Sequence, residues 1–247
     1  MKDNDALYGS IAPLRNVRAM AELINRVKHR AHGLPGMACF YGPSGYGKTS
    51  AAIFAANRFG AYHVQVKSCW TRKKLCEAIL KDLALQPART IADMVDQIAE
   101  ALAASDRPLL IDEADHLVAK GMIEIVRDLH EASGATVILI GEEQLPFKLQ
   151  QWERVHGRML DWVGAEPATL DDVRHLAGIY CQGVELDGAL AQRILDESRA
   201  SIRRISINLE RVSEFARIQG ADRVTGEAFA SKPFFTGVAP APRRVAR

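Results

Sequence analysis

The chain has 247 residues, of which 48% are hydrophobic and 25% charged, and its formal net charge is +2. This composition excludes fibrous and broadly disordered proteins, and it suits one large hydrophobic core with a small second domain. The formal charge would be −2 without the four cations of the last 17 residues, which are Lys232, Arg243, Arg244 and Arg247. Any binding to nucleic acid would therefore depend on local basic patches.

The four cysteines, Cys39, Cys69, Cys76 and Cys181, show no CxxC pair and no histidine spacing typical of a zinc site. We expect reduced, buried thiols. No apolar run approaches the roughly 20 residues that a membrane span requires, and the polar start of the chain is unlike a targeting signal. These features predict a cytoplasmic, nucleoid-associated protein with no membrane partner.

Strands and helices alternate over the first two thirds of the chain. Helical spacing of the apolar residues from Leu14 to Val27 predicts a first helix, and Gly33 ends it. Apolar runs and turn residues predict a helix at 14–32, a strand at 37–41, a helix at 48–59, a strand at 62–66, helices at 71–85 and 91–104, a strand at 108–112, a helix at 121–132 and strands at 136–140 and 162–166. Because the strands are continuously apolar, we expect a parallel sheet covered on both faces.

From Thr169 onward the pattern is helical only. A capping box, "TLDD" at 169–172, opens one helix, and Asp187 can cap the next. The segment 201–218 places Ile202, Ile205, Leu209 and Val212 on one face. We therefore expect an α/β domain at 1–165, a small all-helical domain at 166–230, and a basic, proline-containing mobile tail at 231–247.

The segment "YGPSGYGKTS" at 41–50 matches the phosphate-binding pattern G-x-x-x-x-G-K-[ST] at every fixed position. Its glycines let successive backbone N–H groups face phosphates at the start of a helix. Lys48 would reach the terminal phosphates of ATP, and Thr49 would be a ligand of Mg²⁺. The residues expected to bind ATP are Gly42, Pro43, Ser44, Gly45, Tyr46, Gly47, Lys48, Thr49 and Ser50.

A second motif, "LLIDEAD" at 109–115, places acids directly after a buried strand. Asp112 can complete the Mg²⁺ site, and Glu113 can orient or deprotonate an attacking water. This pair predicts an ATPase that hydrolyses ATP rather than a kinase. Asp115 and His116 are expected to be a helix cap and surface residues.

With these two motifs the chain resembles the AAA ATPases, in particular the initiator-like group that includes transposition protein B of Mu-type phages and related transposon target-selection ATPases. The resemblance covers roughly residues 10–230, with the P-loop and "LLIDEAD" as its specific anchors. It implies a P-loop AAA domain followed by a helical lid. It also implies a homo-oligomer, either a ring or a helical filament, that assembles with ATP on double-stranded DNA and delivers the target to a transposase.

The resemblance assigns roles to two arginines. Arg203 in "SIRRI" corresponds to the lid arginine that meets the nucleotide, with Arg204 as its alternative. Arg158 in "RVHGRM" corresponds to an arginine finger directed at the neighbouring subunit's nucleotide. Arg154 is the alternative finger, since both arginines are expected on one short helical stretch at i,i+4.

The residues after the strand 136–140 depart from the family pattern. The polar sensor at this point is usually Asn, Ser or Thr, but here the strand runs into Gly141 and Glu142. An acid would repel a γ-phosphate unless it is turned away or paired. Gln144 is a second candidate for the sensor, and slow basal hydrolysis is expected.

DNA contact is predicted at the segment 66–75, "VKSCWTRKKL", which carries Lys67, Arg72, Lys73 and Lys74 without an acid. Such cations would contact phosphates, giving binding that is weakly specific and sensitive to salt. Trp70 is expected to pack on the domain. The cations of the first helix and the tail segment "PRRVAR" are weaker candidates, and no separate DNA-binding domain fits before Leu14.

Three functions compete at this point. The first is an ATP-dependent, sequence-nonspecific DNA-binding ATPase that regulates DNA transposition. The second is an AAA ATPase that loads or remodels a protein client such as a replicative helicase. The third, a small-molecule kinase, is disfavoured by Glu113 beside Asp112 and by the helical domain with "IRRI".

Overall fold

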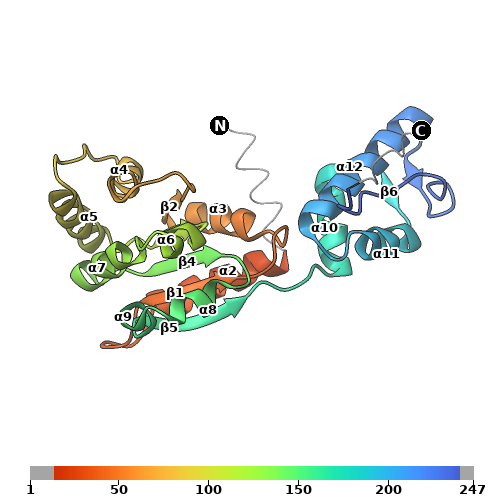
Figure 1. The fold of residues 1–247 in the computed structure, drawn as a ribbon. Helices are drawn as coiled ribbons and strands as arrows, with labels where there is room; N and C mark the ends of the chain where they lie inside the picture. The colour runs from red at the N-terminus through yellow and green to blue at the C-terminus, as the bar shows by residue number, and fades with distance from the viewer. Residues whose placement is uncertain (1–13, 240–247) are drawn as a thin grey trace, which may run out of the picture. The chain divides into compact units, whose positions relative to one another are not determined.

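The computed structural model describes residues 14–239, and these divide into two compact units. The first unit comprises residues 15–166 and contains a five-stranded sheet of order β2-β3-β4-β1-β5 (Figure 1). Its strands are β1 (Met37–Tyr41), β2 (Tyr62–Gln65), β3 (Leu109–Asp112), β4 (Val137–Gly141) and β5 (Met159–Gly164). Every pairing between them is parallel. The prediction of an α/β fold with a parallel sheet is confirmed.

Helices cover both faces of this sheet. On one side, α2 (Arg15–Lys28) and α3 (Lys48–Phe59) contact each other and the strands. On the other side, one continuous apolar cluster joins alternate strand residues such as Cys39 and Ile111 to the remaining helices. These are α4 (Arg72–Asp82), α5 (Ile91–Ser105), α6 (Asp115–Ala119), α7 (Ile123–Ser133), α8 (Leu145–Gln150) and α9 (Glu153–His156).

Three details of this unit differ from the sequence prediction. The last strand is β5, at Met159–Gly164, and not 162–166. All of its residues are half-buried, so its first part lacks the continuous apolar run of the inner strands. The short helices α6 and α8 were not predicted, because they have too few residues to show a helical period. Cys69 is exposed, unlike the other three cysteines, which are buried as expected.

The second unit begins at Pro167 and is built on α10 (Leu170–Tyr180), α11 (Gly188–Glu197) and α12 (Ile202–Gln219). Thr169 and Asp172 form the predicted capping box, and Asp187 accepts a hydrogen bond from the N–H of Leu190. The unit is not purely helical, since β6 (Glu185–Leu186) and β7 (Arg223–Val224) form a two-stranded parallel sheet. Strands of two residues carry no readable pattern.

The predicted mobile tail begins at residue 231, but its first part is packed against α12. Asn208, which is fully buried, donates to the Phe235 carbonyl at 3.1 Å and accepts from the Phe235 N–H at 2.7 Å. Arg211 donates to the Pro233 carbonyl at 3.1 Å. The segment 233–235 therefore has fixed partners, and "PRRVAR" at 242–247 lies outside the described residues.

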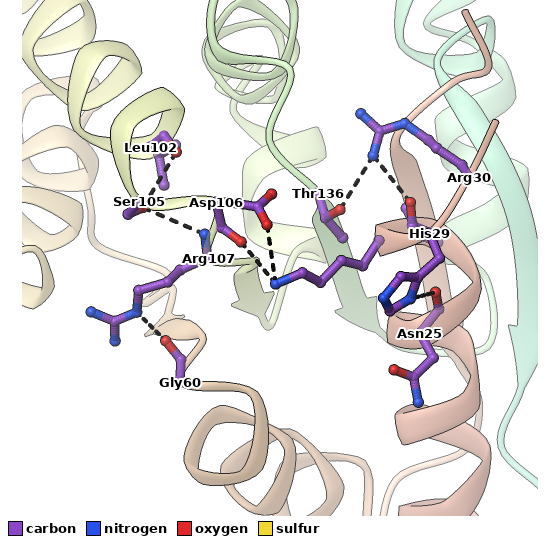
Figure 2. A network of polar contacts seen from close by, with 11 residues as sticks. Asn25, His29, Arg30, Gly60, Leu102, Ser105, Asp106, Arg107 and Thr136 are labelled. Carbon is purple, nitrogen blue, oxygen red and sulfur yellow. Dashed lines mark hydrogen bonds and ion pairs between the residues drawn. The ribbon is translucent and has the colours of Figure 1, made fainter. Parts of the chain in front are cut away.

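All five parallel strands end at the same edge of the large sheet, here called the carboxyl edge; the opposite edge is the amino edge. The P-loop follows β1, and Asp112 ends β3, so both lie at the carboxyl edge. At the amino edge, cations at the end of α2 and just beyond it contact neighbouring loops: Arg30 donates to the Thr136 hydroxyl at 3.3 Å (Figure 2), and Lys28 pairs with Asp106. Arg15 and Arg26 pair with Glu166 and Asp161. Arg15, Arg26 and Lys28 of α2 are thus engaged within the unit, which argues against α2 as a DNA-binding surface.

Candidate functional site

The P-loop has the backbone that phosphate binding requires. Gly42, Gly45 and Gly47 have φ values of 151°, 88° and 83°, a region that side chains disfavour. A Cβ on Gly42 would meet the Cβ of Ala165 at 3.0 Å, so this glycine also allows the close approach of the strand beside it. The loop then enters α3 at Lys48, which directs the first N–H groups of this helix toward the loop.

The P-loop is held in place by hydrogen bonds of Asn16, a residue that the sequence analysis did not single out. Its side chain, 6% exposed, donates to the carbonyls of Tyr46 and Glu166 at 2.8 Å each and accepts from the Glu166 N–H at 2.9 Å. Asn16 thereby joins α2, the P-loop and the segment after β5. Its signal in the sequence was a polar residue next to the apolar stripe of the first helix.

Lys48 and the carboxylates form the charged part of the site. The Lys48 ammonium donates to the Gly42 and Pro43 carbonyls at 2.6 and 2.9 Å. Burial lowers the pKa of Lys48, while nearby Asp112, Glu113, Glu142 and Asp115 oppose this shift. Since these acids outnumber the lysine, the site favours an additional cation.

Thr49 and Asp112 would provide oxygen atoms for such a cation. The Thr49 hydroxyl donates to Asp112 Oδ2 at 2.8 Å, and Asp112 is 2% exposed. A hydroxyl and one carboxylate, completed by phosphate oxygens and water, are the usual donor set for Mg²⁺ in phosphoryl transfer. Bound there, Mg²⁺ would neutralise negative charge on the phosphates.

Glu113 has two features of a catalytic base. Its φ is 57°, a left-handed conformation that costs a non-glycine residue roughly 1–2 kcal/mol. Burial and, secondarily, Asp112 raise the pKa of its carboxyl. An acid held in strain beside another acid at a phosphate site is suited to accept a proton from water.

One protein-family model matches part of this chain. The family model for the AAA domain matches residues 31–149. The matched segment contains the P-loop and the acids that follow β3. The match supports an ATPase, and ATPases of this type bind ATP, typically with Mg²⁺. No curated protein sequence matches the chain.

Solved structures with this fold include initiator and motor proteins. The Aeropyrum pernix ORC1 protein in complex with DNA is 18% identical with a TM-score of 0.61, covering 87% of this chain and 63% of that one. The Aeropyrum pernix ORC2 protein, as ADPNP-ADP complexes, is 15% identical with a TM-score of 0.64, covering 86% and 65%. The Thermotoga maritima RuvB Holliday junction branch migration motor is 19% identical with a TM-score of 0.57, covering 87% and 66%. The chain thus spans slightly less than two thirds of the length of these structures.

The acids that follow β3 and β4 are linked. Asp115 accepts from the Glu142 N–H at 2.7 Å and pairs with Lys148 at 2.7 Å. Its side chain is only 12% exposed and links the start of α6 to Glu142 and α8. The N-cap of α6 is Ala114, so Asp115 is neither the helix cap nor the surface residue that was expected. Glu142 and Gln144 are both exposed, and Gln144 precedes α8.

Arg158 lies at the amino edge of the first unit, far from its own P-loop. Its carbonyl accepts from the N–H of Met37, the first residue of β1, whereas the P-loop follows the last residue, Tyr41. Four strand steps of about 3.3 Å separate these ends by roughly 13 Å. Arg158 is not on one helix with Arg154, because α9 ends at His156 and Gly157 intervenes. Both arginines are exposed.

Arg203 lies in the second unit, near the start of α12, and is exposed. The alternative, Arg204, is half-buried, and a Cβ on Gly237 would meet its Nε at 2.7 Å. Arg204 is thus packed against the end of the described chain, and Arg203 is the more accessible of the two.

The four predicted DNA contacts, Lys67, Arg72, Lys73 and Lys74, are all exposed, and they follow β2 at the carboxyl edge. We call residues 67–74, which end in the first turn of α4, the basic loop. Lys74 pairs with Glu77 at 3.5 Å, while Trp70 packs against the apolar cluster as expected. Lys120, distant in sequence, adds a fifth cation, since its ammonium donates to the Trp70 carbonyl at 3.0 Å.

Within residues 14–239 no helix combines the length and the apolar character needed to cross a membrane.

Proposed function

We propose that this ATPase binds double-stranded DNA through its basic loop and assembles on it as an ATP-dependent homo-oligomer. Hydrolysis, with Glu113 as the base and Lys48, Thr49 and Asp112 holding ATP and Mg²⁺, would release DNA or reset the assembly. The solved structures of this fold include ORC1 in complex with DNA and the RuvB branch migration motor, which supports a DNA-associated role.

The observation that carries this proposal is the attachment of the basic loop to the hydrolytic segment. The N–H of Val66, which precedes the loop, donates to the Asp112 carbonyl at 2.9 Å. Lys120, which follows the short helix after Glu113, donates to the Trp70 carbonyl at 3.0 Å. Both ends of residues 66–70 are therefore bonded to the segment that carries Asp112 and Glu113, so a change at the nucleotide would reach the DNA contacts.

The position of Arg158 supports the oligomer. An arginine at the amino edge cannot serve its own P-loop at the carboxyl edge, but it can enter the site of a neighbouring copy. Arginines that act on the transferred phosphate in this way stabilise charge in the transition state. In the same proposal Arg203 meets the nucleotide from the second unit.

The resemblance to transposition protein B of Mu-type phages supports regulation of DNA transposition, in which the assembly captures target DNA for a transposase. We expect addition of the protein with ATP to increase strand transfer into duplex target by a Mu-type transposase. Strand transfer unaffected by the protein, together with intact DNA binding, would remove transposition from the proposal.

The exposed thiol of Cys69 gives a direct test of DNA binding. Burial raises the pKa of the Cys76 and Cys181 thiols to about 11 and also raises that of Cys39, so a maleimide should label Cys69 selectively. With ATP, long duplex DNA should slow labelling of Cys69 and should sediment with the protein at low salt. Labelling unchanged by DNA would contradict the proposed surface.

Charge reversal locates the surface more sharply. Lys73→Glu should weaken DNA binding and reduce its dependence on salt, because each phosphate contact contributes about one unit to the salt slope. Lys81→Glu is the matched control, since Lys81 is an exposed cation in the last turn of the same helix. Equal losses from both variants would indicate a general charge effect. ATP-dependent assembly without DNA binding would favour the protein-client loader instead.

A further inference from the structure

Arg158 is held by one carboxylate of its own subunit. Its Nε and Nη2 both contact Oε1 of Glu131, at 2.8 and 2.6 Å. This contact uses one flank of the guanidinium and leaves Nη1 outside it. Both side chains remain partly exposed, at 46% for Arg158 and 35% for Glu131, so the outer edge of the guanidinium is accessible to another molecule.

Glu131 is in turn anchored within α7. Its second oxygen, Oε2, lies 3.7 Å from Nη1 of Arg127. Arg127 is only 14% exposed and pairs with Glu124 at 2.8 Å and with Asp128 at 2.6 Å. The three residues form a chain from Arg127 through Glu131 to Arg158, and its inner end is fixed by burial.

The backbone of Arg158 is fixed as well. Its N–H donates to the Val155 carbonyl at 2.9 Å, and its own carbonyl accepts from the Met37 N–H at 3.1 Å. A long side chain on a fixed backbone still has several rotamers, and an arginine loses up to about 2 kcal/mol of rotamer entropy when it is immobilised. The contact with Glu131 restricts those rotamers before any partner arrives.

We propose that Glu131 is a positioning residue, which orients the Arg158 guanidinium so that its outer edge meets the phosphates bound by a second copy of this chain. This inference rests on the proposed action of Arg158 in trans. Preorganised donors stabilise a transition state most effectively because they need no reorganisation during the reaction. Glu131 acts only through Arg158 and does not touch the nucleotide.

The first experiment separates kcat from KM. Glu131→Ala should lower kcat for ATP hydrolysis by the assembled protein about ten-fold, since small misplacement of a catalytic group reduces the rate steeply, and should leave KM for ATP unchanged. Glu131→Gln, which retains an acceptor oxygen, should recover part of the loss. The control is Glu100→Ala, which removes an exposed glutamate of α5, and it should hydrolyse ATP at the wild-type rate.

Mixing experiments identify the side of the interface on which Glu131 acts. Glu131→Ala mixed with Glu113→Gln should regain activity, because one subunit supplies the intact P-loop site and the other the intact arginine. Glu131→Ala mixed with Arg158→Ala should not, because every interface then lacks a properly held arginine. A merely destabilised subunit would not produce this pattern.

Three outcomes would overturn the inference. Glu131→Ala at or above the wild-type rate would mean that the carboxylate is dispensable or restrains Arg158. Loss of activity in Glu131→Ala without rescue by Glu113→Gln, in a preparation where Arg158→Ala is rescued, would place Glu131 elsewhere. If Arg158→Ala itself is not rescued by Glu113→Gln, the action in trans fails, and the positioning role fails with it.

Discussion

The two edges of the five-stranded sheet both carry charged groups, but these groups differ in how they are paired. At the amino edge, Arg30 donates to carbonyls and to the Thr136 hydroxyl, and Arg107 donates to the Gly60 carbonyl (Figure 2). At the carboxyl edge, Asp112 and Glu113 stand side by side, and Lys48 bonds to carbonyls of its own loop. Cations that are bonded to acceptors within the protein stabilise its fold. Like charges that lie close together are instead typical of a ligand-binding site.

The largest effect should follow from removing the base at the carboxyl edge. Glu113→Gln should lower kcat for ATP hydrolysis by about 10²–10⁴-fold, the usual contribution of a general base, and should retain ATP binding. Phosphate release and nucleotide titration measure the two quantities. Glu143→Gln, an exposed acid on the loop after β4, serves as the control and should keep full activity.

The next largest effect should come from removing the hydrogen bonds that Asn16 makes to the P-loop and to Glu166. Asn16→Ala leaves the Tyr46 carbonyl and both backbone groups of Glu166 without their buried partner. Such losses cost about 1–3 kcal/mol, so we expect a fall in Tm of about 2–12 °C for a protein of this size and a higher KM for ATP. Asn25→Ala, an exposed asparagine on the same helix, should change neither quantity. An unchanged KM would confine Asn16 to stability.

A pH series tests the crowding of acids directly. The folded protein raises the pKa of Glu113 above 4.5, so its ionised form is disfavoured by folding. As the pH is lowered, kcat should therefore begin to fall at a pH above the ordinary carboxyl pKa.

The same shift has a consequence for stability. The unfavourable contribution of Glu113 is present above its folded pKa and vanishes below its unfolded pKa. Glu113→Gln should consequently raise Tm at neutral pH, and this gain should disappear in acid below the ordinary carboxyl pKa of 4.5. A gain that is independent of pH would show that the lost charge is not its cause.

The carboxyl edge was largely predictable from sequence, and the amino edge was not. The P-loop, Asp112 and Glu113 follow buried strands, so local pattern and the geometry of parallel strands suffice to bring them together. β5 was placed incorrectly because its residues are half-buried and give no continuous apolar run. The amino edge depends on loops distant in sequence, as in the contact of Arg158 with Glu131.

Single residues show the same division. The sequence indicates no more than an ordinary surface acid on a helix at Glu131, and only the tertiary structure brings it to Arg158. Lys120 likewise joins the basic loop through a contact across 50 residues of sequence. Asn16 could have been noticed as a polar residue beside an apolar stripe, but its partners could not. The left-handed backbone of Glu113 has no sequence signal, because Glu rarely adopts it.

The smallest effect should come from an ion pair of the amino edge. Lys28 lies 3.3 Å from the Asp106 carboxylate, which is 89% exposed, and also donates to the Asp106 carbonyl at 3.1 Å. Exposed pairs contribute about 0.2–1 kcal/mol. Lys28→Ala should therefore lower the free energy of unfolding by no more than about 1 kcal/mol and leave ATP hydrolysis unchanged. Asp106→Asn is the better partner variant for a double-mutant cycle, because Asp106 has a φ of 49° and asparagine tolerates this conformation. A coupling free energy well above 1 kcal/mol, or a loss of hydrolysis, would show that the amino edge does more than hold the fold together.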